Sequence, residues 1–222
     1  MTENTQRLRA TYAKGEAVKY ISHLDLARTM ERAFRRARLP LVYSQGFNPR
    51  PKFAFASALP VGATGRAELL DIWLSPPLSL MEFAKRLAPQ LPEGIELVEA
   101  REVDPHLPAL QASVSHAEYV VTLEAAPPDL EKRLAALLDS DTLPMERQRK
   151  GELRAYDLRP LILELWRVLG GHLPGAEAQI GMKLANSSSA TGRADQVLAA
   201  LGLESAARAV ERTRLYFDLP DR

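Results

Sequence analysis

Four arginines near the N-terminus recur at helical spacing. Arg28, Arg32, Arg35 and Arg36 follow one another at intervals of four, three and one residues, which places them on one side of a helix. A guanidinium group donates paired hydrogen bonds that match the oxygens of a phosphate group. The spacing therefore predicts a phosphate-binding helix face, with an ordinary solvated helix face as the alternative.

A stretch rich in glycine, asparagine and proline follows this helix, SQGFNPRPK at residues 44–52. Residues 20–52 carry seven basic residues against two acidic ones, a net charge of +5, whereas residues 66–104 carry four against eight, a net charge of −4. We expect either a rigid connection into the next strand or a preorganised anion site. In the second case Asn48, Arg50 and Lys52 would lie beside the arginine face.

A histidine at the start of the same helix offers a second chemistry. His23, together with Tyr43 and Lys52, could form an acid–base set that cleaves RNA without a metal ion. The alternative is a histidine that makes only local hydrogen bonds. Phe53 and Phe55 alternate along a strand, where they either stack nucleic-acid bases or pack in the core, and we expect core packing.

A loop of small polar residues, NSSSATG at residues 186–192, precedes Arg193 and a short helix. Free amides at a helix N-terminus bind phosphates, so Arg193 joins the candidate nucleic-acid-binding residues. No Gly-Lys-Ser follows the loop, which rules out a phosphate-binding P-loop. A flexible connection capped by a serine or threonine is the alternative.

Composition excludes several other classes of site. The chain of 222 residues has no cysteine, so disulfides, thiolate metal sites and cysteine nucleophiles are absent. Its four histidines are scattered, and we expect neither a metal site nor a bound cofactor. The N-terminus is polar and no run approaches 18 apolar residues, so we expect a cytoplasmic protein without a signal peptide or membrane span.

The hydrophobic periodicity predicts the elements that position these residues. The first half reads as strand, helix, strand, strand, helix, strand, with Ser22 and Ser79 beginning the two helices. This order is that of the ferredoxin-like βαββαβ unit with an antiparallel sheet. The order repeats less clearly after a proline-containing linker. We therefore predict an α+β protein of two tandem ferredoxin-like units, residues 1–105 and 114–222, joined by the linker 106–113.

One long segment resembles a known family. KYISHLDLARTMERAFRRARLPLVYSQGFNPRPKFAFASALPVG, residues 19–62, is similar to the opening of the bacterial radical-SAM-linked protein family, a domain of unknown function. The shared elements include Ser-His-Leu-Asp, Arg-Arg, Tyr-Ser-Gln-Gly-Phe-Asn-Pro and Leu-Pro-Val-Gly. Residues 157–160, the loop before Arg193 and residues 211–213 also resemble family elements. Arg50 departs from the family, which has histidine there, and this weakens acid–base chemistry at that position.

The resemblance implies a partner rather than an activity. Members of that family occur fused to, or encoded beside, a radical-SAM protein, often near genes for ribonuclease E/G. This chain has no Cys-x-x-x-Cys-x-x-Cys motif, so it cannot hold the iron–sulfur cluster itself. The leading hypothesis is a non-catalytic RNA-binding accessory protein that acts with a radical-SAM enzyme. A metal-independent endoribonuclease using His23 and a purely protein-binding adaptor are the alternatives.

Overall fold

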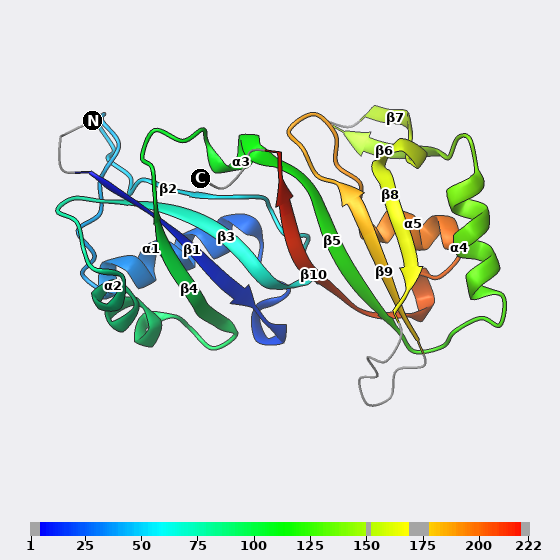
Figure 1. Cartoon of the computed structure of the whole chain (residues 1–222), viewed down its shortest axis with the longest axis horizontal. Helices are drawn as coiled ribbons and strands as arrows, with labels where there is room; N and C mark the ends of the chain where they lie inside the picture. The colour runs from blue at the N-terminus through cyan, green and yellow to red at the C-terminus, as the bar shows by residue number, and fades with distance from the viewer. Residues whose placement is uncertain (1–4, 150–151, 169–177, 219–222) are drawn as a thin grey trace. The chain divides into compact units, whose positions relative to one another are not determined.

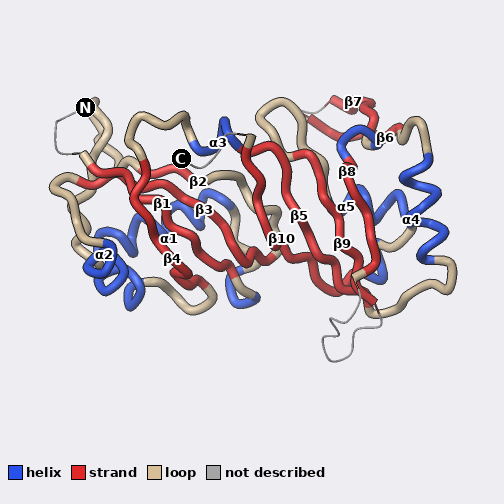
Figure 2. Tube along the Cα trace, in the orientation of Figure 1, coloured by secondary structure: helices blue, strands red, loops and turns tan. Residues whose placement is uncertain are grey.

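Figure 1 shows the computed structural model, which describes residues 5–149, 152–168 and 178–218. The chain divides into two compact units, Met1–Val114 and Ser115–Pro220. Each unit combines helices with an antiparallel sheet (Figure 2). The α+β class predicted from the sequence is thus confirmed.

The first unit has the predicted element order. Its sheet order is β4-β1-β3-β2, and each neighbouring pair is antiparallel. The elements are β1 (Gln6–Lys14), η1 (Glu16–Val18), α1 (His23–Arg36), β2 (Phe53–Phe55), β3 (Thr64–Leu74), α2 (Leu80–Leu87), η2 (Ala88–Gln90), β4 (Ile95–Val103) and α3 (Leu110–Ser113).

The core of this unit lies between the sheet and α1. Leu8, Ala10 and Tyr12 point to one face of β1, as the alternation of a strand requires. The apolar side of α1 packs against that face, and α1 runs behind the strands in the view of Figure 1. The buried side chains of α1 are Leu26, Met30, Ala33 and Phe34. Because these residues occupy the inner side, the intervening arginines are left outside.

Both predicted helix starts are confirmed. The Ser22 hydroxyl accepts a hydrogen bond from the backbone N–H of Asp25 at 3.1 Å, and Ser79 does the same for Glu82 at 3.2 Å. Ser22 also donates its hydroxyl proton to the Asp25 carboxylate at 2.7 Å. That hydrogen bond holds the pKa of Asp25 below its usual value. Each cap satisfies an N–H that a helix start otherwise leaves without a partner.

The second unit has a related order with a hairpin inserted. Its sheet order is β10-β5-β9-β8, and β6 pairs only with β7. α4 packs against β8 and α5. The elements are β5 (Val114–Leu123), α4 (Leu130–Asp139), β6 (Pro144–Arg149), β7 (Glu152–Asp157), η3 (Arg159–Leu161), β8 (Ile162–Arg167), β9 (Ala178–Ala185), α5 (Ala194–Leu201), η4 (Glu204–Ala206) and β10 (Ala207–Phe217).

Two segments have structure that periodicity did not reveal. The apolar run LILELW, which fits a strand and a helix equally well in sequence, lies in strand β8 except for its first residue, Leu161, which ends η3. The proline-containing linker ends in the short helix α3, whose Leu110 is buried. None of the helices in the described part of the chain combines the length and the hydropathy needed to cross a bilayer.

Candidate nucleic-acid interface

Three of the four predicted arginines come together on the outer face of α1. Arg28, Arg32 and Arg35, with Glu31 among them, line a shallow surface depression of about 230 Å³. The Arg28 and Arg35 side chains are 70% and 56% exposed. The depression is therefore an open basic surface rather than an enclosed cavity.

Ion pairs along the helix hold two of these arginines. Arg28 Nη1 lies 3.2 Å from Asp25 Oδ1, and Arg35 Nη2 lies 2.7 Å from Glu31 Oε1. Arg32 has no hydrogen bond or ion pair to any residue that the structure describes. Because exposed ion pairs contribute at most about 1 kcal/mol, an incoming anion can compete for the paired guanidinium groups. Arg32 can bind an anion without first breaking an ion pair.

The fourth arginine has a different role. Arg36 donates to the backbone carbonyl of Gln90 in η2 at 2.6 Å, and it is not among the residues that line the depression. This bond joins the C-terminal end of α1 to η2. The structure thus separates Arg36 from Arg28, Arg32 and Arg35, although all four share one side of the helix in sequence.

The predicted loop is a short hairpin with a fixed stem. Val42 N–H donates to the Trp73 carbonyl at 2.9 Å, Lys52 N–H donates to the Val42 carbonyl at 2.7 Å, and Ser44 N–H donates to the Arg50 carbonyl at 2.8 Å. Gly46, with φ of 133°, permits the turn at the tip. The side chains at the tip, including Phe47 and Asn48, are exposed, as is Arg50. These bonds fix the stem of the loop, and its tip projects into solvent.

The Lys52 side chain, at the end of this hairpin, lies on the face of the sheet that α1 does not cover. Its Nζ lies 4.6 Å from the centre of the Trp73 ring, and Trp73 pairs with Arg7 of β1. The next residue, Phe53, points the other way and contacts Phe34 of α1 at 5.4 Å between ring centres. Since successive strand residues face opposite sides, Lys52 and the depression do not form one surface.

The proposed acid–base set is not assembled. The His23 ring packs edge-on against Phe55, with 5.1 Å between ring centres, and Tyr43 bridges to Pro51 in the hairpin stem. Phe55 pairs with Leu70 of β3, so Lys52 beside Trp73 lies three residues farther along that strand, about 10 Å away. Phe55 is buried and pairs with Phe53 in the core, as expected.

Arg193 lies in the second unit and is already paired. Its Nη2 and Nε lie 2.8 and 3.0 Å from the two Asp195 oxygens, and this hydrogen bonding raises the pKa of Arg193. The preceding loop bonds to itself, because Ala190 N–H donates to the Ser187 hydroxyl at 3.1 Å and Ser187 N–H donates to the Ala190 carbonyl at 2.8 Å. The loop amides used in this way are not available to a phosphate.

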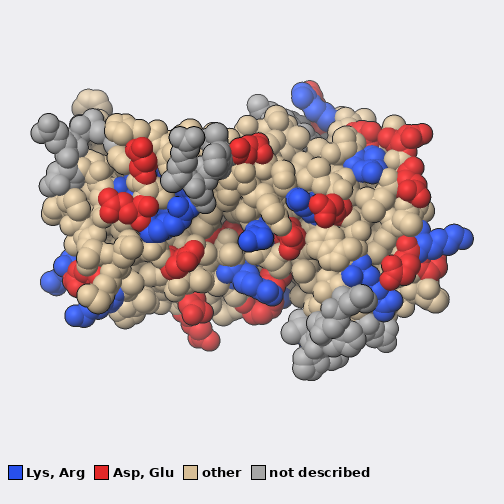
Figure 3. Space-filling view, in the orientation of Figure 1, with Lys and Arg blue, Asp and Glu red and all other residues tan. Residues whose placement is uncertain are grey.

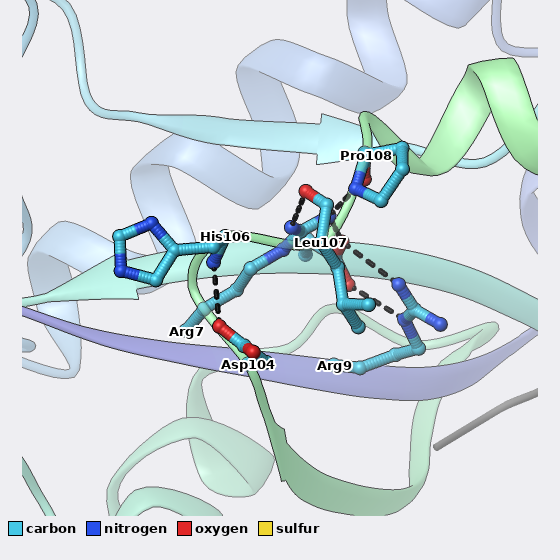
Figure 4. Close-up of polar contacts among 7 residues, drawn as sticks. Arg7, Arg9, Asp104, His106, Leu107 and Pro108 are labelled. Atoms are coloured by element: carbon cyan, nitrogen blue, oxygen red, sulfur yellow. Dashed lines mark hydrogen bonds and ion pairs between the residues drawn. The ribbon is translucent and has the colours of Figure 1, made fainter.

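A buried charge cluster on the side of the first sheet opposite α1 was not singled out from the sequence. Arg7, 1% exposed, and Arg9 both pair with Asp71. Arg7 also donates to the Leu107 and Pro108 carbonyls at 2.6 and 2.9 Å (Figure 4). The sequence pattern that could have revealed this cluster is the alternation of Arg7 and Arg9 with apolar residues in one strand. Because its donors are used internally, the cluster is structural.

The charges on the side of the first sheet opposite α1 do not form a uniformly basic surface. Figure 3 shows basic and acidic side chains interspersed over the strands of the first unit. Within the described residues, no group of three or more His, Asp or Glu side chains could hold a metal ion. The depression on α1 is thus the best-supported candidate for binding a phosphate backbone.

Comparison with known proteins identifies one family. The family model described as "Uncharacterized protein conserved in bacteria (DUF2344)" matches residues 7–193. No curated protein matches the sequence. Among solved structures, the chain is similar to one described as "Crystal Structure of a Cbf5-Nop10-Gar1 Complex", with 11% identity and a TM-score of 0.45. The match covers 95% of this chain and 48% of that one, so the chain spans about half the length of that neighbour.

Proposed function

We propose that this chain, which belongs to the bacterial DUF2344 family, is a non-catalytic RNA-binding accessory protein. The proposal rests on the surface of the chain itself. The depression on α1 carries this proposal. It presents Arg28, Arg32 and Arg35 to solvent within eight residues of helix, about 10 Å along the axis. Guanidinium groups at this density suit a phosphate backbone better than a single small anion.

The partner in this proposal is a separately encoded radical-SAM enzyme that modifies or processes the bound RNA in the cytoplasm. This part rests on the resemblance of residues 19–62 to radical-SAM-linked proteins. Since the chain contains no cysteine, the partner would hold the iron–sulfur cluster and carry the reaction. The residues of this chain would bind and position the RNA.

We also propose that both units are ferredoxin-like. In the first unit the strand order is β4-β1-β3-β2, and in the second β10-β5-β9-β8. When strands are numbered within each unit and the β6–β7 hairpin is treated as an insertion, both orders become 4-1-3-2. The shared order supports the proposal that the two units have the same ferredoxin-like plan.

The test is RNA binding by the purified chain over a salt series from about 50 to 200 mM, with EDTA present. The double variant Arg32→Ala/Arg35→Ala should weaken binding at low salt and reduce the slope of log affinity against log salt by about 1.4, since each phosphate contact with a single strand contributes about 0.7. The matched control is Lys85→Ala/Arg86→Ala, which removes two charges from α2. Equal slopes in the two double variants, or no binding by the unmodified chain, would contradict the proposal.

The same reactions test the absence of catalysis. We expect the RNA to remain intact after prolonged incubation, because His23 lies against Phe55 rather than beside Tyr43 and Lys52. Cleavage in EDTA that His23→Ala abolishes would instead establish an endoribonuclease.

A further inference from the structure

Large apolar side chains are exposed beside the N-terminal end of α1. Tyr20 is 73% exposed, Leu24 68% and Val61 62%. The first two flank the Ser22 cap of α1, and Val61 belongs to the Leu-Pro-Val-Gly segment of residues 59–62. These three side chains lie outside the core of the first unit.

The backbone around Tyr20 is held in place by buried contacts. Gly62 N–H donates to the Lys19 carbonyl at 2.9 Å. The ammonium group of Lys14, a residue only 2% exposed, donates to the same carbonyl at 2.9 Å. These two bonds fix the position of the residue before Tyr20 and tie it to the 59–62 segment. Tyr20 therefore projects from a rigid base.

One side of the Tyr20 ring lies against a glycine. A Cβ on Gly62, which has φ of +87°, would lie 3.7 Å from Tyr20 Cε1. The Lys19 ammonium lies 5.2 Å from the ring centre. The ring thus has Gly62 beside one edge and the Lys19 ammonium, which is paired with Glu16 at 2.7 Å, near it, and it is still largely open to solvent. This combination is that of a stacking platform for a nucleic-acid base.

The exposed apolar end continues into the basic depression. Leu24, Arg28 and Arg35 recur at intervals of four and seven residues, so they lie along one stripe of the helix. From Leu24 to Arg35 this stripe extends about 16 Å. Tyr20 is four residues before Leu24, so their Cα atoms are at most about 14 Å apart. One continuous surface can therefore present an aromatic ring followed by guanidinium groups.

We infer that this surface binds single-stranded RNA, with an unpaired base stacked on Tyr20 and the adjoining phosphates on Arg28, Arg32 and Arg35. The inference rests on the proposed RNA-binding function and specifies its substrate class. Duplex RNA does not offer such a base, because its bases are stacked inside the helix. The ring of Tyr20 selects for a single strand, and the arginines supply affinity without reading the sequence.

A protein partner fits this surface less well. Three scattered apolar side chains make a small patch, whereas a stable protein interface buries more than about 1,000 Å² with a mostly apolar centre. The arginines match a regular array of negative charge. An acidic amphipathic peptide is the competing occupant, and it enters the test as such.

The first experiment compares a short single-stranded oligouridylate with a duplex RNA of equal length, using fluorescence anisotropy and the full chain. Tyr20→Ala should weaken single-strand binding about fivefold to a hundredfold, the usual effect of losing one stacked base. It should leave duplex binding and the salt slope unchanged, and Tyr20→Phe should restore the affinity. Because Tyr20 is mostly exposed, both variants should keep the unfolding temperature of the unmodified chain.

A second measurement locates the base directly. Light-induced cross-linking of an oligonucleotide that contains 5-iodouridine should attach it to the tryptic peptide YISHLDLAR, residues 20–28. Mass spectrometry of the digest identifies that peptide. Attachment confined to other peptides would contradict stacking on Tyr20.

The outcomes separate the inference from the proposed function. If Tyr20→Ala binds single strands normally while Arg32→Ala/Arg35→Ala binds them poorly, the stacking inference fails and RNA binding stands. Equal losses for single strands and duplexes in Tyr20→Ala would also overturn it. No binding of either RNA by the unmodified chain overturns both proposals. Tyr20-dependent binding of an acidic Glu/Leu amphipathic peptide, with no RNA binding, would assign the surface to a protein.

Discussion

Glu31 accepts a hydrogen bond from Arg35 one helical turn away, at 2.7 Å, inside the depression that both residues line. The pair supports the helix, yet its carboxylate opposes any phosphate that approaches the arginines. In the proposed RNA complex, the negative charge of Glu31 would therefore lower the affinity that the arginines provide.

Removing the negative charge of Glu31 should strengthen RNA binding. We expect Glu31→Gln to raise affinity about twofold to fivefold at low salt, since one charge at about 4 Å in water is worth about 1 kcal/mol. The gain should shrink as salt rises, because screening weakens exposed charges. Anisotropy titrations with oligouridylate measure both effects. The matched control is Glu82→Gln on α2, where Arg86 forms an equivalent pair at 2.6 Å. The same gain in both variants would argue against a local effect.

Loss of the Ser22 cap should change both stability and titration. Ser22→Ala should destabilise the first unit by about 1 kcal/mol, because the Asp25 N–H loses its acceptor. Since the Ser22 hydrogen bond depresses the pKa of Asp25, that pKa should rise toward its usual value in the variant. NMR titration of the Asp25 carboxyl measures it, and Ser79→Ala is the control that should leave it unchanged.

The sign of the pH dependence follows from that depressed pKa. The contribution of Asp25 to stability is present above the pKa of the unfolded chain and is lost as pH falls through the lower folded pKa. Urea unfolding across the acid range should therefore show a smaller pH-dependent loss in Ser22→Ala than in the unmodified chain. An identical dependence in the two proteins would contradict this assignment.

Asp71 should be essential to the first unit. Both Arg7 and Arg9 depend on it as their shared carboxylate, and it is fully buried. Asp71→Asn leaves two buried cations without that countercharge, so we expect a loss of about 3–5 kcal/mol in the free energy of unfolding. Urea denaturation measures it. The control Glu164→Gln breaks an exposed pair with Lys183 and should cost less than about 1 kcal/mol.

A glycine in the second unit should resist substitution. Trp166 of β8 pairs with Gly181 of β9, and a Cβ at Gly181 would lie 2.0 Å from Trp166 Cε2. Gly181→Ala should displace the indole and cost about 1–3 kcal/mol. A red shift in tryptophan fluorescence would report the displacement. Gly15→Ala, where the added Cβ would lie 3.5 Å from the Gly94 carbonyl oxygen, should leave the spectrum unchanged.

Local patterns predicted the framework of the first unit well. The caps at Ser22 and Ser79 and the alternation in β1 are set by residues close in sequence, and each is found where it was expected. The 3.6-residue period of α1 is found from Leu26 onward, whereas Leu24, which the same period places on the inner side, is 68% exposed. The last strand of the order predicted for the first half is found as β4, Ile95–Val103. The assignment of LILELW to a strand needed the neighbouring strand β9, with which it pairs.

Which residues belong to the candidate site depends on contacts between residues that are far apart in the sequence. Arg36 leaves the arginine group because it bonds to Gln90, 54 residues away. Lys52 turns to the other face because Trp73 lies there. The pairing of Arg7 with Asp71 spans 64 residues. Helical spacing predicted which arginines could share a surface, whereas tertiary partners decided which of them do.

The bonds from Arg7 to the carbonyls of Leu107 and Pro108 have a consequence for synthesis on the ribosome. Arg7 finds these two acceptors about a hundred residues later in the chain, after the strands on both sides of β1 have been made. In a nascent chain that ends before Leu107, the Arg7 guanidinium group lacks these two acceptors and must stay in contact with water. Strand β1 therefore cannot be fully buried at that stage. We therefore expect the first unit to fold late and in one step, while translation has already moved on to the second.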